Sequence, residues 1–492
     1  MTNGLLIKAA TILDPETPLR VGDLRIAHGR IVEIGRRLRR EDEEEIDASR
    51  MLAMPGLVNA HTHSGQSLDR GTANNMPLDL WMVWSVYGGP ELTPEDAYTT
   101  AACGALEMLA SGCTSVLDQV YLPLEEFDAH AEAVLTAYAD VGMRAVVAPM
   151  VQDRDFLESL ELEHDAGARP LAPLSQTYEP RRVLDHLERF VASAAGRTAT
   201  LTAALGPTAP QRCSDELLGL ILELARRTGV GVHTHLLETK TQRLAAERRY
   251  GRPIVEHLAA LGYLSGDVSY AHGVWLTPDE FVQVGCAGAT IVHNPVSNLR
   301  LGSGVMPLQY LIRRGIAVAL GSDGAASNDS QNLFEVLKVA SILHTLYGAR
   351  RSWLQPEDVW RACLLGGAGA LRAPVGRIAP DAAADIVLLR LDRHALGSRQ
   401  RLVASLINAE HGESVDTVVV GGRVVLREGA STGVDEVAVR QAGRAFMDRT
   451  AACLPRRARI YAAYEQAIGR SIDRVEIDTL EPVKWWPTPG GC

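Results

Sequence analysis

The sequence predicts a (β/α)₈ barrel of the TIM type with a small β-sandwich domain built from both termini. Three observations support this prediction: both ends of the chain are rich in strand-like runs, the middle alternates strand-like and helical runs, and polar residues follow the strand-like runs. At 492 residues the chain is longer than an ordinary domain, and it has room for one large barrel and a smaller unit.

Composition narrows the class of protein. A chain with 46% hydrophobic and 22% charged residues is typical of a globular protein, and the net charge of −11 argues against a nucleic-acid-binding surface. The seven cysteines are odd in number and lack Cys-x-x-Cys spacing, which predicts reduced thiols. No signal peptide and no run of eighteen apolar residues is found. We therefore expect a cytoplasmic protein with neither nucleic-acid nor membrane partners.

The small domain is predicted over residues 1–55 and 376–434. The first segment contains a hairpin with His28-Gly29 as its turn, and the second contains a hairpin around Gly421-Gly422. Two β-rich segments that flank a different middle favour one sheet domain built from both ends.

The barrel is predicted over residues 56–375. A helical run follows each strand-like run, as expected of parallel strands joined by helices, and in such barrels the chemistry lies at the C-terminal ends of the strands. The eight runs are Val58–Ala60, Thr114–Leu117, Arg144–Met150, Leu201–Leu205, Val230–His235, Val268–His272, Thr290–Asn294 and Ala317–Asp323.

Two further segments have no place in the barrel pattern. Asp153–Pro180 is an irregular excursion after the third run, predicted to be a lid or an oligomer contact. Residues 435–492 are predicted to be a helical C-terminal extension and tail. The tail contains Trp485-Trp486, and exposed tandem tryptophans favour packing on this or another subunit.

The first strand-like run ends in His61-Thr62-His63. Positions i and i+2 of a strand point to the same face, so His61 and His63 are predicted to project side by side. Two imidazoles on one face can supply two ligands to one metal ion, although such a pair is also compatible with a core or surface position.

Other strand-like runs also end in metal-capable or acid/base residues. Taken singly, His272 fits a core histidine, Asp323 a helix cap and Glu238 a carboxylate in a first helical turn. Because five of the eight ends carry such residues, a single shared site is favoured over chance. Three imidazoles and one carboxylate suit Zn²⁺ or Fe²⁺ with one open position. The residues at the later four ends are His233, His235, Glu238, His272, His293 and Asp323.

From about residue 4 to 430 the sequence resembles the amidohydrolase superfamily. More narrowly, it resembles the mononuclear branch that holds cytosine deaminase, S-adenosylhomocysteine-type deaminases and triazine hydrolases. The predicted fourth strand contains no lysine, so no carboxylated lysine is expected. The motifs are Pro55-Gly56-Leu57-Val58-Asn59-Ala60-His61-Thr62-His63, His233-Thr234-His235-Leu236-Leu237-Glu238-Thr239, Ala271-His272-Gly273, His293-Asn294-Pro295-Val296-Ser297-Asn298-Leu299-Arg300-Leu301-Gly302-Ser303-Gly304 and Gly321-Ser322-Asp323-Gly324-Ala325-Ala326-Ser327-Asn328-Asp329.

The resemblance implies a ligand set and catalytic roles. His61, His63, His235 and Asp323 would hold one divalent metal ion per chain, Zn²⁺ in preference to Fe²⁺. His233 is a second candidate on the same strand, but the motif places the ligand three residues before Glu238, so His235 is preferred and His233 is expected to be packed and hydrogen-bonded.

The resemblance also implies a reaction. A metal-bound hydroxide would attack the amine-bearing carbon of a ring, and ammonia would leave. Glu238 would protonate a ring nitrogen, Asp323 would accept the proton of the water, and His272 would orient the hydroxide.

Four residues are predicted to contact substrate. Gln66 and Trp84 follow the first strand, with Trp81 nearby, and an aromatic side chain there could stack on a flat ring or belong to the core. Asn298 and Ser327 follow the seventh and eighth strands.

One departure concerns the substrate. Nucleoside-type members commonly have a histidine where this chain has Thr208, and an acidic residue in the stretch that here is Trp81-Met82-Val83-Trp84-Ser85. The departure favours a free base or a triazine- or pyrimidine-like ring over a ribose-bearing substrate.

Three functions are weighed. The first is a metal-dependent hydrolytic deaminase of an amino-substituted pyrimidine-, purine-, pterin- or triazine-like heterocycle. The second uses the same site to hydrolyse a C–Cl, C–N(alkyl) or cyclic amide bond of a heterocycle. The third, a non-catalytic binding scaffold, is disfavoured because every expected metal ligand is present. Family resemblance also implies a homodimer or larger homo-oligomer.

Overall fold

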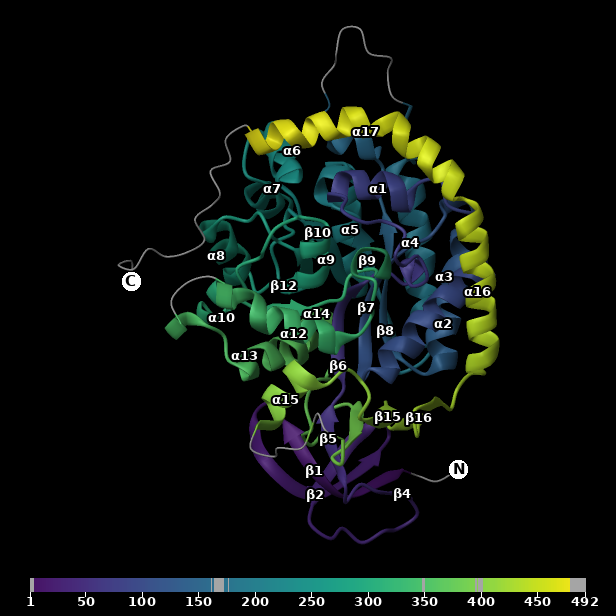
Figure 1. The fold of residues 1–492 in the computed structure, drawn as a ribbon, viewed down its shortest axis with the longest axis vertical. Helices are drawn as coiled ribbons and strands as arrows, with labels where there is room; N and C mark the ends of the chain where they lie inside the picture. Colours follow the sequence, from purple (N-terminus) through teal and green to yellow (C-terminus); the bar gives the residue numbers. More distant parts are fainter. Residues whose placement is uncertain are drawn as a thin grey trace.

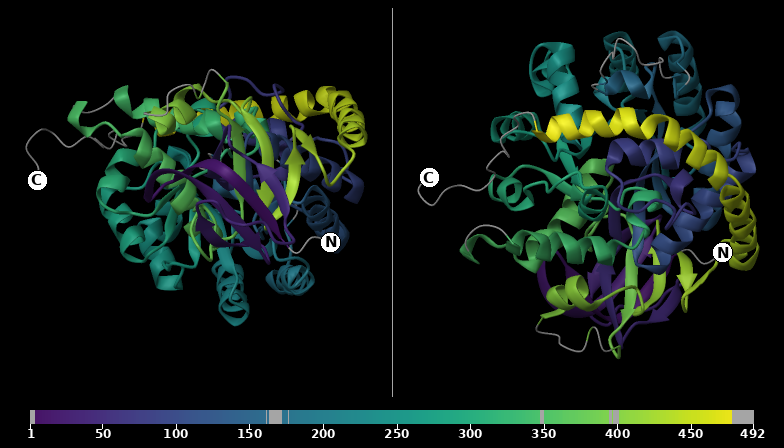
Figure 2. Two further views of the ribbon diagram at one scale, coloured as in Figure 1. Left: turned by 90° about the horizontal axis from the view of Figure 1, so that it is seen from below. Right: turned by 45° about the horizontal axis from the view of Figure 1, so that its top comes forward.

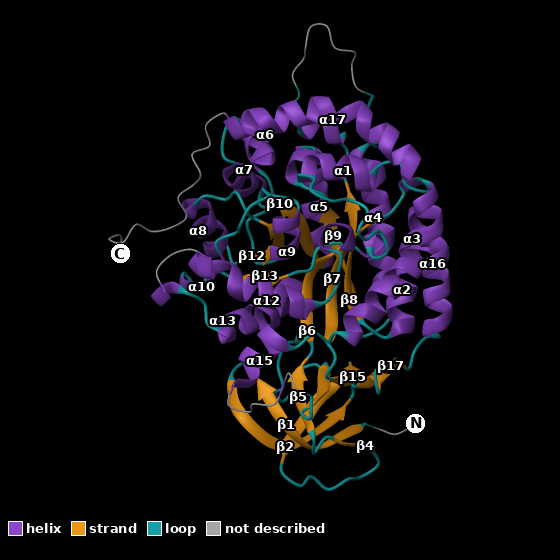
Figure 3. Cartoon of the chain, in the orientation of Figure 1, coloured by secondary structure: helices purple, strands orange, loops and turns teal. Residues whose placement is uncertain are grey.

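The computed structural model describes residues 4–160, 162, 172–175, 177–346, 350–393, 396 and 401–477. An eight-stranded parallel sheet forms a barrel, and a nine-stranded mixed sheet built from both ends of the chain lies beneath it (Figure 1, Figure 3). The predicted fold class is confirmed. Within the described ranges, no helix has the length and apolar character needed to cross a membrane.

The barrel strands follow one another in chain order around the sheet. The first and last strands come together where the Asp323 amide donates to the His61 carbonyl oxygen over 2.9 Å, which nearly closes the barrel. The strands are β6 (Leu57–Thr62), β7 (Cys113–Tyr121), β8 (Arg144–Val151), β9 (Leu201–Pro207), β10 (Gly231–Leu236), β11 (Val268–His272), β12 (Thr290–His293) and β13 (Val318–Leu320).

The helices begin where the sequence has capping residues. Thr93 and Asp96 form a capping box at the start of α2, and Ser214 caps α5. The helices are α1 (Leu78–Val86), α2 (Pro94–Ala110), α3 (Phe127–Val141), α4 (Pro180–Ala194), α5 (Asp215–Thr228), α6 (Lys240–Tyr250), α7 (Ile254–Leu261), α8 (Pro278–Cys286), α9 (Pro295–Arg300), α10 (Leu308–Arg313), α11 (Ala325–Asn328), α12 (Leu333–Leu343), α13 (Pro356–Arg361), α14 (Gly367–Leu371), α15 (Leu402–Ala409), α16 (Glu436–Ala452) and α17 (Leu454–Ile477).

The terminal sheet joins the two ends of the chain through antiparallel pairing of β5 with β14, in which Pro55 lies opposite Ile386. The predicted hairpins at His28-Gly29 and Gly421-Gly422 are confirmed. Figure 2 shows this sheet from below. Its strands are β1 (Leu5–Asp14), β2 (Thr17–Ala27), β3 (Arg30–Gly35), β4 (Glu44–Asp47), β5 (Met51–Pro55), β14 (Ile386–Arg390), β15 (Val415–Val420), β16 (Arg423–Arg427) and β17 (Ala430–Ser431).

Gly56 marks the point where the chain leaves the sheet for the barrel. A Cβ atom there would lie 2.0 Å from the Thr114 hydroxyl oxygen, so only glycine fits. Beside it, the Arg144 guanidinium donates to both oxygens of buried Asp385, over 2.7 and 2.9 Å. This bidentate pair ties the barrel to the sheet.

Helices α16 and α17, here called the C-terminal arm, extend beyond both sheets. Helix α16 runs beside α2, and α17 crosses the barrel above the C-terminal ends of its strands (Figures 1 and 2). Part of the 153–180 excursion and the whole tail from residue 478, with Trp485-Trp486, lie outside the described residues.

The eighth barrel strand is shorter than predicted. The expected strand Ala317–Asp323 ends at Leu320. Asp323 has a φ of 62°, and its amide donates to the His61 carbonyl oxygen of β6. Gln66, Trp84, Asn298 and Ser327, expected in loops, lie in short helical segments.

Candidate metal centre and active site

Three imidazoles meet at the C-terminal ends of β6 and β10. One ring nitrogen from each of His61, His63 and His235 lies within 4.8 Å of the others, and the Nε2 atoms of His235 and His63 are 3.3 Å apart. His61 lies in β6 and His63 follows it in extended backbone, so the two side chains, two residues apart, project together.

Outer hydrogen bonds orient these imidazoles. The Nδ1 atom of His63 donates to the Gln119 carbonyl oxygen over 2.5 Å, and that of His235 donates to the Thr208 carbonyl oxygen over 2.6 Å. His61 Nδ1 is hydrogen-bonded to His233 Nε2 at 2.8 Å. Each Nε2 is therefore free to face the centre, as in protein metal sites.

Asp323 completes the cluster from the end of β13. Its Oδ1 lies 3.4 Å from His61 Nε2 and 3.2 Å from His63 Nε2. Burial by itself would raise the pKa of Asp323, but His61 and His63 outweigh it and hold that pKa well below its ordinary value. Burial lowers the pKa of His61 to about 4, so its ring is neutral.

These donors fit a divalent metal ion. The buried Nε2 of His61 has no hydrogen-bond partner among the described residues, and such an atom calls for a ligand. Neutral imidazoles and an ionised carboxylate are ligands that Zn²⁺ and Fe²⁺ accept. His233 is outside the cluster of ligand atoms because both its nitrogens are hydrogen-bonded, to His61 and to the Ser269 hydroxyl.

Backbone strain is concentrated around this cluster. Leu237, His272 and Asp323 all have positive φ, at 45°, 74° and 62°, although none is glycine. Left-handed backbone is unfavourable for such residues and is common at functional sites. Here it turns the strand ends so that Glu238, His272 and Asp323 face one space.

Glu238 and His272 lie beside the metal-ligand cluster. His272 Nε2 is 3.6 Å from Glu238 Oε2 and 4.0 Å from Asp323 Oδ2, and it has no hydrogen-bond partner among the described residues. Burial raises the pKa of Glu238 to about 7. Two carboxyl groups in one site thus have opposite pKa shifts, which is how acid and base roles are separated.

The predicted substrate contacts divide into two groups. Gln66 lies against Gly324, the residue after Asp323, because a Cβ atom on Gly324 would be 1.9 Å from the Gln66 Oε1. Trp84 packs against a buried cluster that includes Trp81 and Leu301. Asn298 Oδ1 instead accepts from His272 Nδ1 over 2.8 Å, and Ser327 is hydrogen-bonded to Ser297, which donates to Asp323. Asn298 and Ser327 therefore belong to the hydrogen-bond network around His272 and Asp323, and their contact with substrate stays a prediction.

Sequence reasoning missed Asp79. This residue in α1 is 4% exposed, its hydrogen-bond partner is the Thr241 side chain, and burial raises its pKa to about 6. Its charge also contributes to the raised pKa of Glu238, so it lies near the active site. The first barrel loop therefore has a buried acid, two residues before the stretch that was expected to lack one. The Thr208 hydroxyl, by contrast, donates to Val151 and is not directed at substrate.

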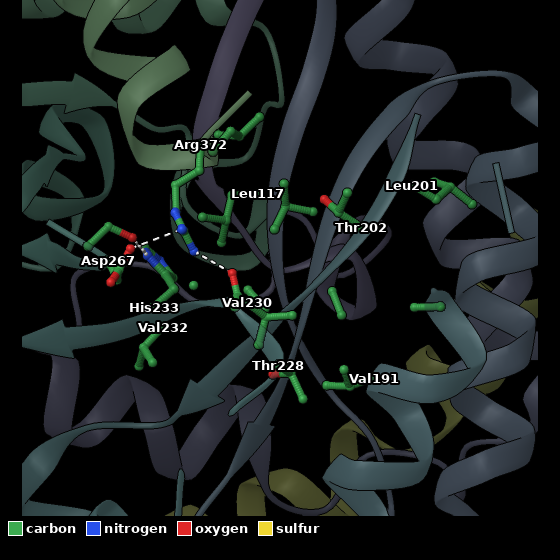
Figure 4. Close-up of a pocket in the computed structure, with 18 of the residues that line it drawn as sticks. Leu117, Val191, Leu201, Thr202, Thr228, Val230, Val232, His233, Asp267 and Arg372 are labelled. Carbon is green, nitrogen blue, oxygen red and sulfur yellow. Dashed lines mark hydrogen bonds and ion pairs between the residues drawn. The ribbon is translucent and has the colours of Figure 1, made fainter. Parts of the chain in front are cut away.

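A separate cavity lies at the opposite end of the barrel (Figure 4). It has a volume of about 360 Å³ at the N-terminal ends of β9 and β10, where aliphatic side chains such as Leu117 and Val232 form its walls. An ion pair of Arg372 with Asp267 lies at its edge. His233 lines it and separates it from the metal-ligand cluster. Glu238 and His272 are at the other strand ends, so this cavity is separate from the candidate site.

Comparison with known proteins identifies the family to which the chain belongs. The model of the amidohydrolase family matches residues 52–425. A 5-methylthioadenosine/S-adenosylhomocysteine deaminase of Thermococcus sibiricus is 33% identical over 407 residues, 82% of this chain and 89% of the relative. A 5'-deoxyadenosine deaminase of Methanosarcina mazei is 33% identical over 442 residues, 88% of this chain and 95% of the relative.

Two solved structures have the same architecture. An adenosine deaminase from Xanthomonas campestris with bound zinc has a TM-score of 0.81 at 25% identity, covering 91% of this chain and 99% of that one. The atrazine chlorohydrolase of Arthrobacter aurescens TC1, complexed with zinc, has a TM-score of 0.80 at 25% identity, covering 90% and 100%. By sequence and by fold, the chain belongs to the amidohydrolase family.

Proposed function

We propose that this protein is a metal-dependent hydrolytic deaminase that replaces the amino group of a nitrogen heterocycle by oxygen and releases ammonia. The observation that supports it best is the pair of carboxyl groups around His272: Glu238 with a raised pKa and Asp323 with a lowered one. A ring amine is a poor leaving group, so its departure needs both an acid and a base.

The side chains divide the proton transfers. Ionised Asp323 accepts the proton of the attacking water, while protonated Glu238 donates a proton to the ring nitrogen next to the reacting carbon. His272, whose Nδ1 donates to Asn298, directs its Nε2 lone pair at the water and orients it. The carbon–oxygen bond forms and the carbon–nitrogen bond breaks. The proton that Asp323 took from water passes to the leaving nitrogen, which departs as ammonia, and the proton of the new hydroxyl group returns to Glu238. Three of these residues are buried, which keeps bulk water from competing.

The metal is proposed to be one zinc ion per chain, held by His61, His63, His235 and Asp323, with ferrous iron as the alternative. When bound, such an ion polarises water and lowers its pKa toward neutrality. The zinc in the solved deaminase and chlorohydrolase supports this assignment.

The substrate is proposed to be an aminopurine-type ring. The relatives named above act, by their names, on adenosine derivatives, and Asp79 supplies a buried carboxyl group near Glu238 that could accept hydrogen bonds from a polar substituent. The side chain of Thr208 still favours a free ring, so free bases and 5'-modified nucleosides are both to be tested.

A second candidate function is hydrolysis of a C–Cl, C–N(alkyl) or cyclic amide bond at the same site. The similarity to the atrazine chlorohydrolase supports it, but at 25% identity against 33% for the deaminases. The location in the cytoplasm and the homodimer or larger assembly stay predictions.

The test is a paired measurement on purified protein. Metal analysis is expected to show about one zinc or iron per chain. Ammonia release is then measured with adenine, adenosine, 5'-deoxyadenosine, aminopterins, aminopyrimidines, aminotriazines and atrazine. Ammonia from an aminated ring is the expected result; chloride or an alkylamine without ammonia from any compound would establish the second function.

A further inference from the structure

The C-terminal arm covers the first barrel loop, residues 64–93. Helix α17 packs along α1, the helix of that loop, above the C-terminal ends of the strands (Figure 1). Five buried side chains form one cluster here: Val83 of α1, Phe156 and Leu160 from the segment after β8, and Tyr464 and Ile468 of α17. The loop thus lies between the arm and the active site.

A buried ion pair joins the arm to this loop. Arg457 Nη1 is 2.9 Å from one carboxylate oxygen of Asp69 and 3.1 Å from the other, and the two side chains are 4% and 9% exposed. Thr72 also donates to Asp69, over 2.9 Å, and the Asp69 amide donates to the Gln66 carbonyl oxygen. Charges buried to this extent persist only when paired in good geometry, so the pair constrains where the loop can lie.

Other contacts leave the loop little room to shift. A Cβ atom on Gly88 would be 2.8 Å from Ile460, and one on Gly89 would be 3.4 Å from the Arg457 guanidinium. The Trp84 ring meets the edge of Tyr461 at 5.8 Å between centroids. The arm therefore approaches the loop backbone closely on one side, while the other side faces the metal-ligand cluster.

The same loop holds the groups that face substrate in the proposed function. Gln66 lies over Gly324 beside Asp323, three residues from Asp69. Asp79 and Trp84 lie on α1, and the Trp81 indole donates to the Ala326 carbonyl oxygen over 3.1 Å. Among the described residues, His61, His63, His235 and Asp323 form no hydrogen bond or ion pair with the arm, so a change in the arm reaches the substrate groups first.

We propose that Arg457 is a positioning residue for substrate: its ion pair with Asp69 holds the first barrel loop, with Gln66, Asp79 and Trp84, at the height above the metal-ligand cluster that the ring requires. This inference rests on the proposed function for the identity of the substrate side of the site. It assigns to a helix outside the barrel a part in substrate binding.

The test compares two ion pairs that both fasten the arm. Arg457→Met removes the pair with Asp69 of the loop. Arg449→Met removes the pair with Asp96 of α2, which contacts the loop through its last residue, Thr93. Arg457→Lys is the conservative variant, since one nitrogen of Arg457 makes both contacts and an ammonium group can replace it. The double variant Asp69→Asn/Arg457→Met leaves no lone buried charge, and so guards against simple unfolding.

The kinetic readout uses the substrate found by ammonia release, with rates expressed per bound metal ion. For Arg457→Met and for the double variant, KM is expected to rise about tenfold or more while kcat falls less than about threefold, as for lost positioning of substrate contacts. Arg457→Lys should stay within about threefold of the wild-type KM, and Arg449→Met within about twofold. A KM unchanged in Arg457→Met, or raised equally in Arg449→Met, would overturn the proposal.

A second readout needs no substrate. Hydrogen exchange of the amides of residues 64–89 is expected to quicken about tenfold or more in Arg457→Met and in the double variant, but not in Arg449→Met. If hydrogen exchange of residues 64–89 stayed at the wild-type rate in Arg457→Met and in the double variant, the proposal would be overturned, even if no compound released ammonia. Quickened exchange in a protein that releases no ammonia would instead show that the loop is held as inferred and that the proposed function has failed.

Discussion

The two ends of the barrel have opposite chemistry. At the C-terminal ends of the strands, six titratable side chains are crowded around one point: His61, His63, His235, Glu238, His272 and Asp323. At the N-terminal ends, the cavity in Figure 4 has mainly aliphatic walls, and its charged groups, Arg372 and Asp267, are 39% and 65% exposed. The charged groups beside this cavity are left largely in solvent, whereas those at the C-terminal ends of the strands are buried.

This difference separates function from stability. Burying a carboxyl or an imidazole opposes folding unless a partner compensates it, so such groups persist where chemistry requires them. The charged groups beside the cavity at the N-terminal ends need no such explanation, because exposed ion pairs change the free energy of unfolding little. His233 lies at the boundary, facing the cavity on one side and hydrogen-bonded to His61 on the other. Four substitutions test this contrast.

The largest effect is expected at Glu238. Glu238→Gln keeps the shape of the side chain and removes its exchangeable carboxyl proton, so turnover should fall roughly 10³-fold. Metal content should not change, because Glu238 is not among the clustered ligand atoms. Steady-state rates of ammonia release and metal analysis on the same sample check this. Retained turnover would remove Glu238 from the mechanism.

The second largest effect is expected at His233, which lies between the cavity and the metal-ligand cluster. His233→Phe fills a similar volume but leaves His61 Nδ1 without its partner, so metal affinity should fall about 10- to 100-fold. Competition with a chromogenic chelator measures this. His130 in α3, another buried histidine with both nitrogens hydrogen-bonded, provides the control: His130→Phe should leave metal affinity unchanged. Equal losses in both variants would show a general folding defect.

A gain in stability is expected at Asp79. Burial raises its pKa to about 6, whereas an unfolded aspartate has 3.8, so between these values the folded chain binds the extra proton. The free energy of unfolding therefore falls as pH rises from about 4 to about 6. Asp79→Asn mimics the protonated form and should be more stable by about 3 kcal/mol at pH 8, with no difference well below pH 4. Urea unfolding at both pH values checks this, and a loss of stability at pH 8 would contradict it.

The smallest effect is expected at Asp267, beside the cavity at the N-terminal ends of the strands. Asp267→Asn breaks an ion pair whose partners are largely exposed, so the free energy of unfolding should change by less than about 1 kcal/mol. Ammonia release should stay within about twofold of wild type. A tenfold loss of activity would mean that the cavity at the N-terminal ends is energetically coupled to the metal centre. The contrast between the two ends would then no longer hold.

Much of the site could be predicted from local sequence. His61 and His63 lie together because side chains two residues apart in extended backbone point to the same side. Glu238 follows His235 by three residues at the end of β10. Motifs at the ends of parallel strands meet because the barrel brings all eight ends to one face. His61, His63, His235, Glu238, His272 and Asp323 could therefore be listed without coordinates.

Other features depend on contacts between distant parts of the chain. The hydrogen bond that the Asn298 amide oxygen accepts from His272, 26 residues earlier, could not be predicted from local sequence. Asp79 resembled an ordinary residue in a first helical turn, and only its burial near Glu238 distinguishes it. No local pattern connects Asp69 with Arg457, 388 residues later.

The sequence by itself determined the barrel, the terminal sheet, the family and the set of metal-capable side chains, because strand period, helix caps and motif spacing are local properties of the chain. The tertiary structure alone decided which of those groups are buried, which outer partners orient the imidazoles, how the two carboxyl pKa values separate, and which helix covers the first loop. The physical reason is that burial and electrostatic coupling depend on distances through space, and these are not defined until the chain has folded.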